Sequence, residues 1–187
     1  YDAAPFGRRG GAVIPSLDFG RTGHRSSRIV FGAVALWNAS PEQTAETLEK
    51  LLERGVNHID VANGYGPAEV RVGESMPRLR ERFFLATKTG SRSAPQARAD
   101  IHRSLERLRV DQIDLIQLQS LGHPDDWDEA MGPGGSLEGV VEARPQGLQR
   151  LRHLRVVQEP PKLRIDFACD RHLDAERVPV HAITLVR

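Results

Sequence analysis

Three side chains that can hold or transfer a proton lie near the ends of two apolar segments. Asp60 and Tyr65 are both in the stretch NHIDVANGYG over residues 57–66. Lys88 ends the next apolar segment, within FLATKTG over 84–90. If the two segments are neighbouring parallel strands, their carboxyl ends meet at one rim. A carboxylate, a phenol and an amine would then converge there.

The three groups together suit proton donation to a carbonyl oxygen. A phenol with a pKa of ~10 is a poor acid at neutral pH, but a nearby ammonium favours its ionised form. A carboxylate beside the amine keeps the amine charged and in place. Tyr65 can then give a proton to the oxygen as hydride arrives at the carbon. Taken singly, Asp60 is typical of a loop acid or helix cap and Lys88 of a surface lysine, so only their combination favours catalysis.

Alternating apolar segments predict the elements that position these residues. An almost wholly apolar run over 29–36 predicts a strand buried on both faces. Ser40, Pro41 and Gln43 predict a helix that begins with a capping box. A hairpin is predicted around Arg21–Gly23. Further strands are predicted at 56–61, 83–87 and 113–118, and further helices at 67–76 (stopped or kinked by Pro77), 97–108 and 137–144.

Four alternations of strand and helix imply βα units, a parallel sheet and right-handed crossovers. Periodicity alone fits both a doubly wound sheet and a half barrel. The 187 residues are enough for a domain with its own core, whereas a complete eightfold barrel typically needs ~250.

Composition excludes several classes of function. The 26 basic and 25 acidic residues give a net charge of +1, which argues against a nucleic-acid binder. No apolar run approaches the ~20 residues of a membrane span, so no membrane partner is expected. The single cysteine, Cys169, excludes an intrachain disulfide and a multi-thiolate metal site, and it is typical of a reducing, cytoplasmic compartment.

An ordered series of short matches links these segments to a known family. It comprises Phe19–Gly23, Phe31-Gly32, Gly55, Asp60, Ala62, Tyr65-Gly66, Glu69, Gly73, Thr87-Lys88 and the stretch 104–115. Together they resemble the aldo/keto reductase superfamily over residues 17–147. The resemblance implies an α/β fold, a partial TIM (β/α)8-like barrel of about four βα units with an N-terminal hairpin and an irregular C-terminal tail.

The resemblance also implies an activity, the NADPH-dependent reduction of an aldehyde or ketone, with a small carbonyl compound as substrate. It assigns Tyr65 as proton donor, Lys88 as the cation that assists it and Asp60 as the group that pairs with Lys88. One position departs from the family pattern, because Gln119 stands where the family has a catalytic His. Its amide can still donate a hydrogen bond and orient a substrate. No cofactor-binding residue is assigned, and no metal site is predicted.

The resemblance ends abruptly near residue 147. The family continues with a strand carrying an Ile-Gly-Val-Ser-like stretch, but this chain reads LQRLRHLR over 148–155. We therefore divide the chain into an extension (1–16), a half barrel (17–147) and a divergent tail (148–187), in which 183–186 could form a short strand. A frameshift would produce such a change, and comparing the reading frames of the encoding DNA would test that hypothesis.

Two functions are consistent with the sequence. One is an aldo/keto-reductase-type enzyme whose activity is impaired by Gln119 and by the lack of the family's second half. The other is a truncated, inactive remnant or an interaction module built on a half barrel. Because a half barrel leaves open sheet edges, we also expect a homo-oligomer or an aggregation-prone chain.

Overall fold

The computed structural model describes residues 13–143, 151–156 and 165–167. Its main sheet contains β3 (Phe31–Gly32), β4 (His58–Asp60), β5 (Phe84–Thr89), β6 (Ile113–Leu118), β7 (Leu151–Val156) and β8 (Ile165–Phe167). The strands lie side by side in chain order, parallel from β3 to β7, with β8 antiparallel at the edge. The predicted parallel sheet is therefore confirmed.

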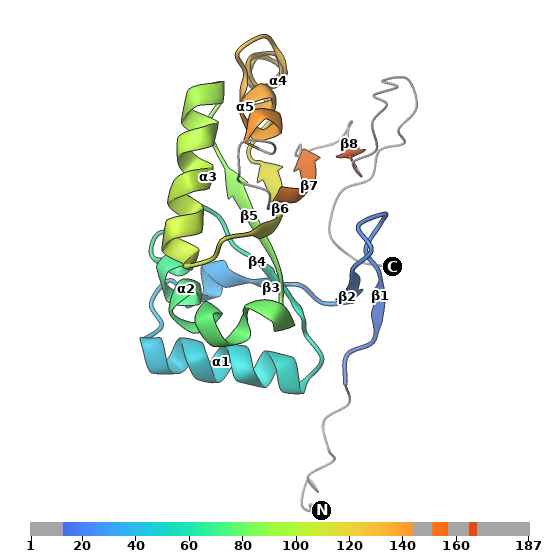
Figure 1. The fold of residues 1–187 in the computed structure, drawn as a ribbon, viewed down its shortest axis with the longest axis vertical. Helices are drawn as coiled ribbons and strands as arrows, with labels where there is room; N and C mark the ends of the chain where they lie inside the picture. Colours follow the sequence, from blue (N-terminus) through green and yellow to red (C-terminus); the bar gives the residue numbers. More distant parts are fainter. Residues whose placement is uncertain (1–12, 144–150, 157–164, 168–187) are drawn as a thin grey trace, which may run out of the picture.

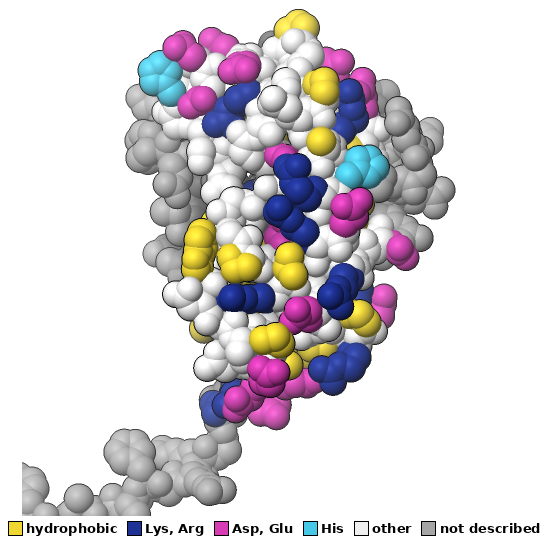
Figure 2. Space-filling view, turned by 90° about the vertical axis from the view of Figure 1, so that its left-hand side faces the viewer, with side chains coloured by type: hydrophobic (Ala, Val, Ile, Leu, Met, Phe, Trp, Pro, Cys, Tyr) yellow, Lys and Arg dark blue, Asp and Glu magenta, His cyan; other side chains and the backbone are white. Residues whose placement is uncertain are grey.

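Helices cover one face of this sheet (Figure 1). They are η1 (Ala33–Leu36), α1 (Pro41–Glu53), α2 (Ala68–Leu79), η2 (Arg80–Arg82), α3 (Ala94–Leu108), α4 (Pro124–Met131) and α5 (Ser136–Glu142). Their outer surface carries basic and acidic side chains interspersed with separate hydrophobic ones (Figure 2). No helix in the described part of the chain is long and apolar enough to cross a membrane.

Helix α1 begins as predicted. The Ser40 hydroxyl accepts a hydrogen bond from the backbone N–H of Gln43, and the Gln43 side chain accepts one from the Ser40 N–H. The first turn thereby satisfies two backbone donors that would otherwise have no partner. Leu48 lies wholly inside the core, so the capped helix is fixed against the sheet by its apolar side.

The prediction of one long strand over 29–36 was wrong. Only Phe31 and Gly32 pair in the sheet, and residues 33–36 form the 3₁₀ turn η1. Ala33 and Leu36 are buried, whereas Ile29 and Val34 are about half exposed. Buried positions three apart fit the three-residue period of a 3₁₀ helix, a spacing that the uniformly apolar run conceals.

The sequence predicts that Pro77 stops or kinks the second helix, and the structure shows that it does not stop it. Helix α2 continues through Pro77 to Leu79. Both Met76 and Leu79 are buried, so packing on both sides of the proline compensates for the missing backbone hydrogen bond.

Several elements lie where none was predicted, among them η2, α4, β7 and β8. Helix α4 starts at Pro124 with two acids in its first turn, a signal that the sequence did contain. Strand β7 pairs parallel with β6 from Ile113↔Leu151 to Leu118↔Val156, so the part of the tail read as aperiodic adds a strand. The predicted strand at 183–186 lies outside the described residues.

The predicted N-terminal hairpin is confirmed as β1 (Ser16–Asp18) and β2 (Arg25–Ser27). It lies on the side of the sheet opposite the helices (Figure 1). Phe19 and His24 bring their rings to within 5.6 Å of Phe84, and the Ser26 hydroxyl is 2.9 Å from Nδ1 of His58. His58 is buried, because the hairpin covers the start of β4 and β5.

Helices α2 and α3 meet at Gly73. A Cβ on Gly73 would lie 2.0 Å from the Arg107 carbonyl oxygen and 2.9 Å from the Leu108 backbone. Backbone atoms cannot move aside as a flexible side chain can, so only glycine permits this approach.

We expect Gly73→Ala to lower the free energy of unfolding by ~3 kcal/mol, because the added methyl group must push the two helices apart. Urea unfolding followed by circular dichroism measures the change. Gly32→Ala is the matched control, since its Cβ would meet no atom within 4 Å. Similar midpoints for both variants would contradict the close packing of α2 against α3 at Gly73.

Candidate active site

The carboxyl ends of β4, β5 and β6 form one rim of the sheet. In the parallel ladder Asp60 pairs with Ala86, and Lys88 pairs with Gln117. Side chains alternate across a strand, so Ala86 and Lys88 project to the same face of β5. That face is opposite the one on which Thr87 bonds to Glu69 of helix α2.

Asp60 and Lys88 form a partly buried ion pair at this rim. The Lys88 Nζ lies 2.6 Å from Asp60 Oδ2 and 3.0 Å from the carbonyl oxygen of Val61. The Lys88 side chain is 11% exposed and that of Asp60 27%. The carboxylate and the carbonyl together satisfy two of the ammonium's hydrogen-bond donors and hold it in place.

Tyr65 is held beside this pair by a tight turn. Its N–H donates to the Ala62 carbonyl, and its own carbonyl accepts from the N–H of Ala68 at the start of α2. Gly66 follows with φ of +55°, and a Cβ there would lie within 3.0 Å of the Trp37 ring. Only glycine meets both conditions, so Gly66 fixes the course of the loop that carries Tyr65.

The Lys88 ammonium lies over the face of the Tyr65 ring, 4.8 Å from its centroid. A cation at this distance is attracted by the π electrons of the ring. The structure therefore brings together the three residues that the sequence singled out, in an arrangement that can support proton transfer by Tyr65.

Buried polar contacts hold β5 from the helix side. Thr87 donates to Oε1 of the fully buried Glu69, whose other oxygen is 3.4 Å from Arg107. Thr89 and Ser91 both donate to Oδ2 of Asp100 on α3. Because Lys88 lies between two anchored threonines, its backbone has little freedom to shift.

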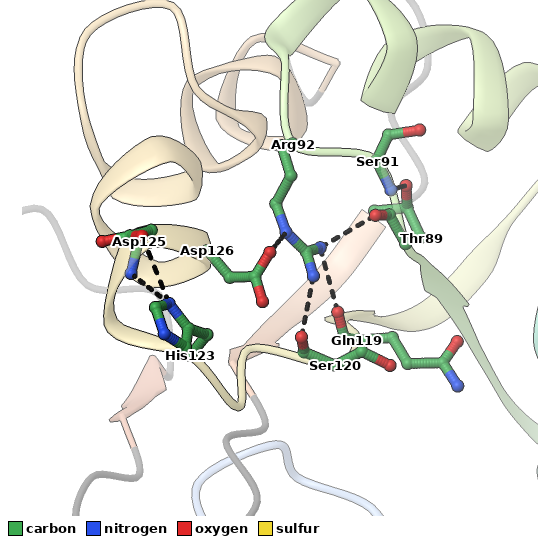
Figure 3. A network of polar contacts seen from close by, with 9 residues as sticks. Thr89, Ser91, Arg92, Gln119, Ser120, His123, Asp125 and Asp126 are labelled. Carbon is green, nitrogen blue, oxygen red and sulfur yellow. Dashed lines mark hydrogen bonds and ion pairs between the residues drawn. The ribbon is translucent and has the colours of Figure 1, made fainter.

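Gln119 follows β6 at the same rim. Its N–H donates to the Thr89 carbonyl at 2.9 Å, which continues the pairing of β5 with β6. Within residues 13–143, no hydrogen bond or ion pair joins its side chain to Asp60, Tyr65 or Lys88. His123, four residues on, is exposed and caps helix α4 by accepting the Asp125 N–H (Figure 3).

Sequence reasoning missed two polar residues at this rim. Gln117 is 7% exposed and lies opposite Lys88 across the ladder. Its position two residues before Gln119, on the same face of the strand, could have indicated it. Asn63 lies between Asp60 and Tyr65, and its N–H donates to the Lys88 carbonyl at 3.3 Å.

Two buried polar atoms at the rim have no hydrogen-bond partner among the described residues. They are Oδ1 of Asp60, an acceptor, and Nδ2 of Asn63, a donor. Buried polar groups are normally satisfied, so these atoms fit a ligand that offers both a donor and an acceptor. In the described part of the chain, no three His, Cys, Asp or Glu side chains are placed to share a metal ion.

Curated proteins include relatives of this chain. The chain is 34% identical over 132 residues to the 6-dehydroglucose reductase of Novosphingobium aromaticivorans, a match that covers 57% of this chain and 43% of that protein. The chain thus spans less than half the length of this curated relative.

Solved structures show the same fold. An aldo-keto reductase from Bacillus halodurans, in its holo form, superposes with a TM-score of 0.67 and 26% identity over 79% of this chain and 51% of that one. An aldo-keto reductase from Bombyx mori, in complex with NADP, gives a TM-score of 0.57 and 23% identity over 78% of this chain and 47% of that one.

These likenesses confirm the partial barrel. The Aldo/keto reductase family model matches residues 28–147, and this range contains the Asp60, Tyr65 and Lys88 cluster and ends where the resemblance was expected to end. The chain therefore belongs to the aldo/keto reductase family, a family of oxidoreductases.

Proposed function

We propose that this chain reduces a small aldehyde or ketone with NADPH, and that Asp60, Tyr65, Lys88 and Gln119 form its catalytic site. The observation that carries the proposal is the Asp60–Lys88 ion pair beneath the rim, with its ammonium over the Tyr65 ring. A purely structural ion pair has no need of a phenol beside the ammonium, whereas proton donation to a carbonyl needs both.

Each residue has a distinct role in this proposal. Tyr65 gives its hydroxyl proton to the carbonyl oxygen, and the product is an alcohol. Lys88 offsets the negative charge that develops on the phenol oxygen, and Asp60 holds Lys88 in position. Gln119 donates an amide hydrogen bond to the carbonyl oxygen and thereby orients the substrate.

NADPH, when bound, supplies the hydride that reduces the carbonyl carbon. The orphaned Asp60 Oδ1 and Asn63 Nδ2 fit a group rich in hydroxyls and carbonyls, as this cofactor is. The Bombyx mori relative was solved with NADP, which further supports the choice of cofactor. The name of the Novosphingobium aromaticivorans relative supports a carbonyl compound as substrate.

A non-catalytic role, as an inactive remnant or an interaction module, is the second candidate. Gln119 in place of the family's His is the observation that favours it. Titration of NADPH fluorescence with the protein separates the two. Saturable binding supports the enzyme. Absence of binding at protein concentrations up to ~10⁻³ M, where a Kd corresponds to about 4 kcal/mol of binding free energy, would refute the enzyme.

We expect Gln119→His to raise the rate of carbonyl reduction by ~10²-fold, since one well-placed donor at a developing negative charge has about this effect. The imidazole directs its N–H from a stiffer side chain than glutamine. NADPH oxidation with an activated aldehyde, followed by absorbance, measures the change. Gln119→Asn is the matched control, because it keeps the amide on a shorter side chain. If Gln119→His binds NADPH yet gains no activity, position 119 does not face the substrate.

A further inference from the structure

A single arginine, Arg92, connects the loop after β5 to the loop after β6. The second loop carries Gln119, the proposed substrate-orienting residue. The Arg92 side chain, in the loop after β5, is 16% exposed and forms an ion pair with Asp126 of helix α4 at 3.1 Å. Its guanidinium also donates to three backbone carbonyls, those of Gly90 at 2.8 Å, Gln119 at 3.1 Å and Ser120 at 2.7 Å (Figure 3).

The segment that Arg92 contacts has an unusual backbone. Ser120 has φ of +61°, a left-handed conformation that residues other than glycine rarely adopt. Arg92 donates to the carbonyl of Gln119, which precedes Ser120, and to the carbonyl of Ser120 itself. The two contacts therefore lie on either side of the strained backbone torsion. These two bonds oppose a return of the segment to an ordinary conformation.

The hydrogen bonds to the Gln119 backbone also determine the direction in which its side chain points. The Gln119 N–H is held by the Thr89 carbonyl and the Gln119 carbonyl by Arg92, so its backbone is fixed on both sides. Figure 3 shows the Gln119 side chain extending away from Arg92. We propose that Arg92 is a positioning residue that holds the backbone of Gln119–Ser120 and so directs the side-chain amide of Gln119. The catalytic consequence of this positioning rests on the function proposed above.

Only arginine fits this place. One carboxylate and three carbonyl oxygens surround the group, and a planar guanidinium presents five N–H donors in a fixed fork. A lysine ammonium has three donors and no fixed plane. Arg92→Lys therefore retains the ion pair with Asp126 but loses part of the contact with Gln119 and Ser120.

Amide hydrogen exchange by NMR tests the conformational part without any need for activity. In Arg92→Gln we expect the backbone N–H of Gln119 to exchange at least ~10-fold faster. The backbone N–H groups inside β6 should be unchanged, because local opening is independent of global unfolding. Arg98→Gln is the matched control, since Arg98 is also an arginine near the start of α3 and pairs with Glu142 away from the rim. Unchanged exchange at Gln119 would overturn the proposal. If Arg92→Gln fails to fold, Arg92→Lys takes its place, and the increase in exchange is expected to be smaller.

Kinetics in the Gln119→His chain test the catalytic part. We expect Arg92→Gln to lower kcat by ~10-fold or more, because small misplacements of an orienting group slow the reaction. KM for the aldehyde and Kd for NADPH should stay within ~2-fold, and Arg92→Lys should recover part of kcat. A merely structural role would lower the active fraction without rescue by lysine, and this result, or an unchanged kcat, would contradict positioning.

The two experiments fail separately. If the Gln119→His chain has no turnover, the proposed function is at fault, and the exchange rate of the Gln119 amide still decides whether Arg92 holds the segment. If turnover is present but Arg92→Gln affects neither exchange nor kcat, the inference about Arg92 is wrong and the proposed function stands.

Discussion

Replacing Tyr65 with Phe in the Gln119→His chain is expected to reduce carbonyl reduction by ~10³-fold or more, because the substitution removes the proton donor. The ring itself remains, so its contacts with Lys88 and the core are kept. Only the hydroxyl is lost, which makes this a clean test of its chemical role.

The measurement is NADPH oxidation with an activated aldehyde at saturating cofactor. NADPH binding and the urea midpoint should match those of the Gln119→His parent, since neither depends on the hydroxyl in our proposal. Activity within tenfold of the parent would show that another group supplies the proton. Equal loss of NADPH binding would instead indicate that the hydroxyl contacts the cofactor.

Replacing Lys88 with Met should lower kcat by ~10²-fold or more in the same background, at the low end of general acid contributions. The thioether fills the space of the lysine stem but carries no charge. The Asp60 carboxylate, formerly 2.6 Å from the ammonium, is then left without its cation and opposes negative charge on the phenol oxygen.

Two further variants serve as controls for the Lys88→Met result. Lys50→Met makes the same substitution at an exposed lysine that pairs with Glu46 on α1, and it should leave kcat unchanged. The double variant Lys88→Met/Asp60→Asn removes the uncompensated carboxylate and should regain stability but little activity. Recovery of activity in the double variant would mean that the unpaired carboxylate, rather than the missing ammonium, caused the loss.

Much of the site could be predicted because its residues follow buried parallel strands. Strand β6 lies at Ile113–Leu118, the residues expected from its apolar run. Once β4 and β5 are neighbours, the alternation of side chains places Asp60 and Lys88 at one rim. The capping signal at Ser40 likewise depends only on local hydrogen bonds, which sequence patterns report well.

The remaining features depend on contacts between distant segments. His58 is buried because a hairpin more than 30 positions earlier covers it, and a strand pattern contains no information on that cover. Arg92 is bound mostly by backbone carbonyls, which every residue type possesses, so no partner can be read from the sequence. Pro77 lies inside a helix because the burial of Leu79 favours continuation.

The agreement between strand order and chain order has a consequence for synthesis on the ribosome. Each strand from β4 to β7 pairs with the strand made just before it, so its partner has already emerged when it appears. Sheet growth by addition at one edge keeps each loop closure short, and short closures are fast. The Asp60–Lys88 pair joins β4 to β5, and it can form before Gln119 has emerged from the ribosome.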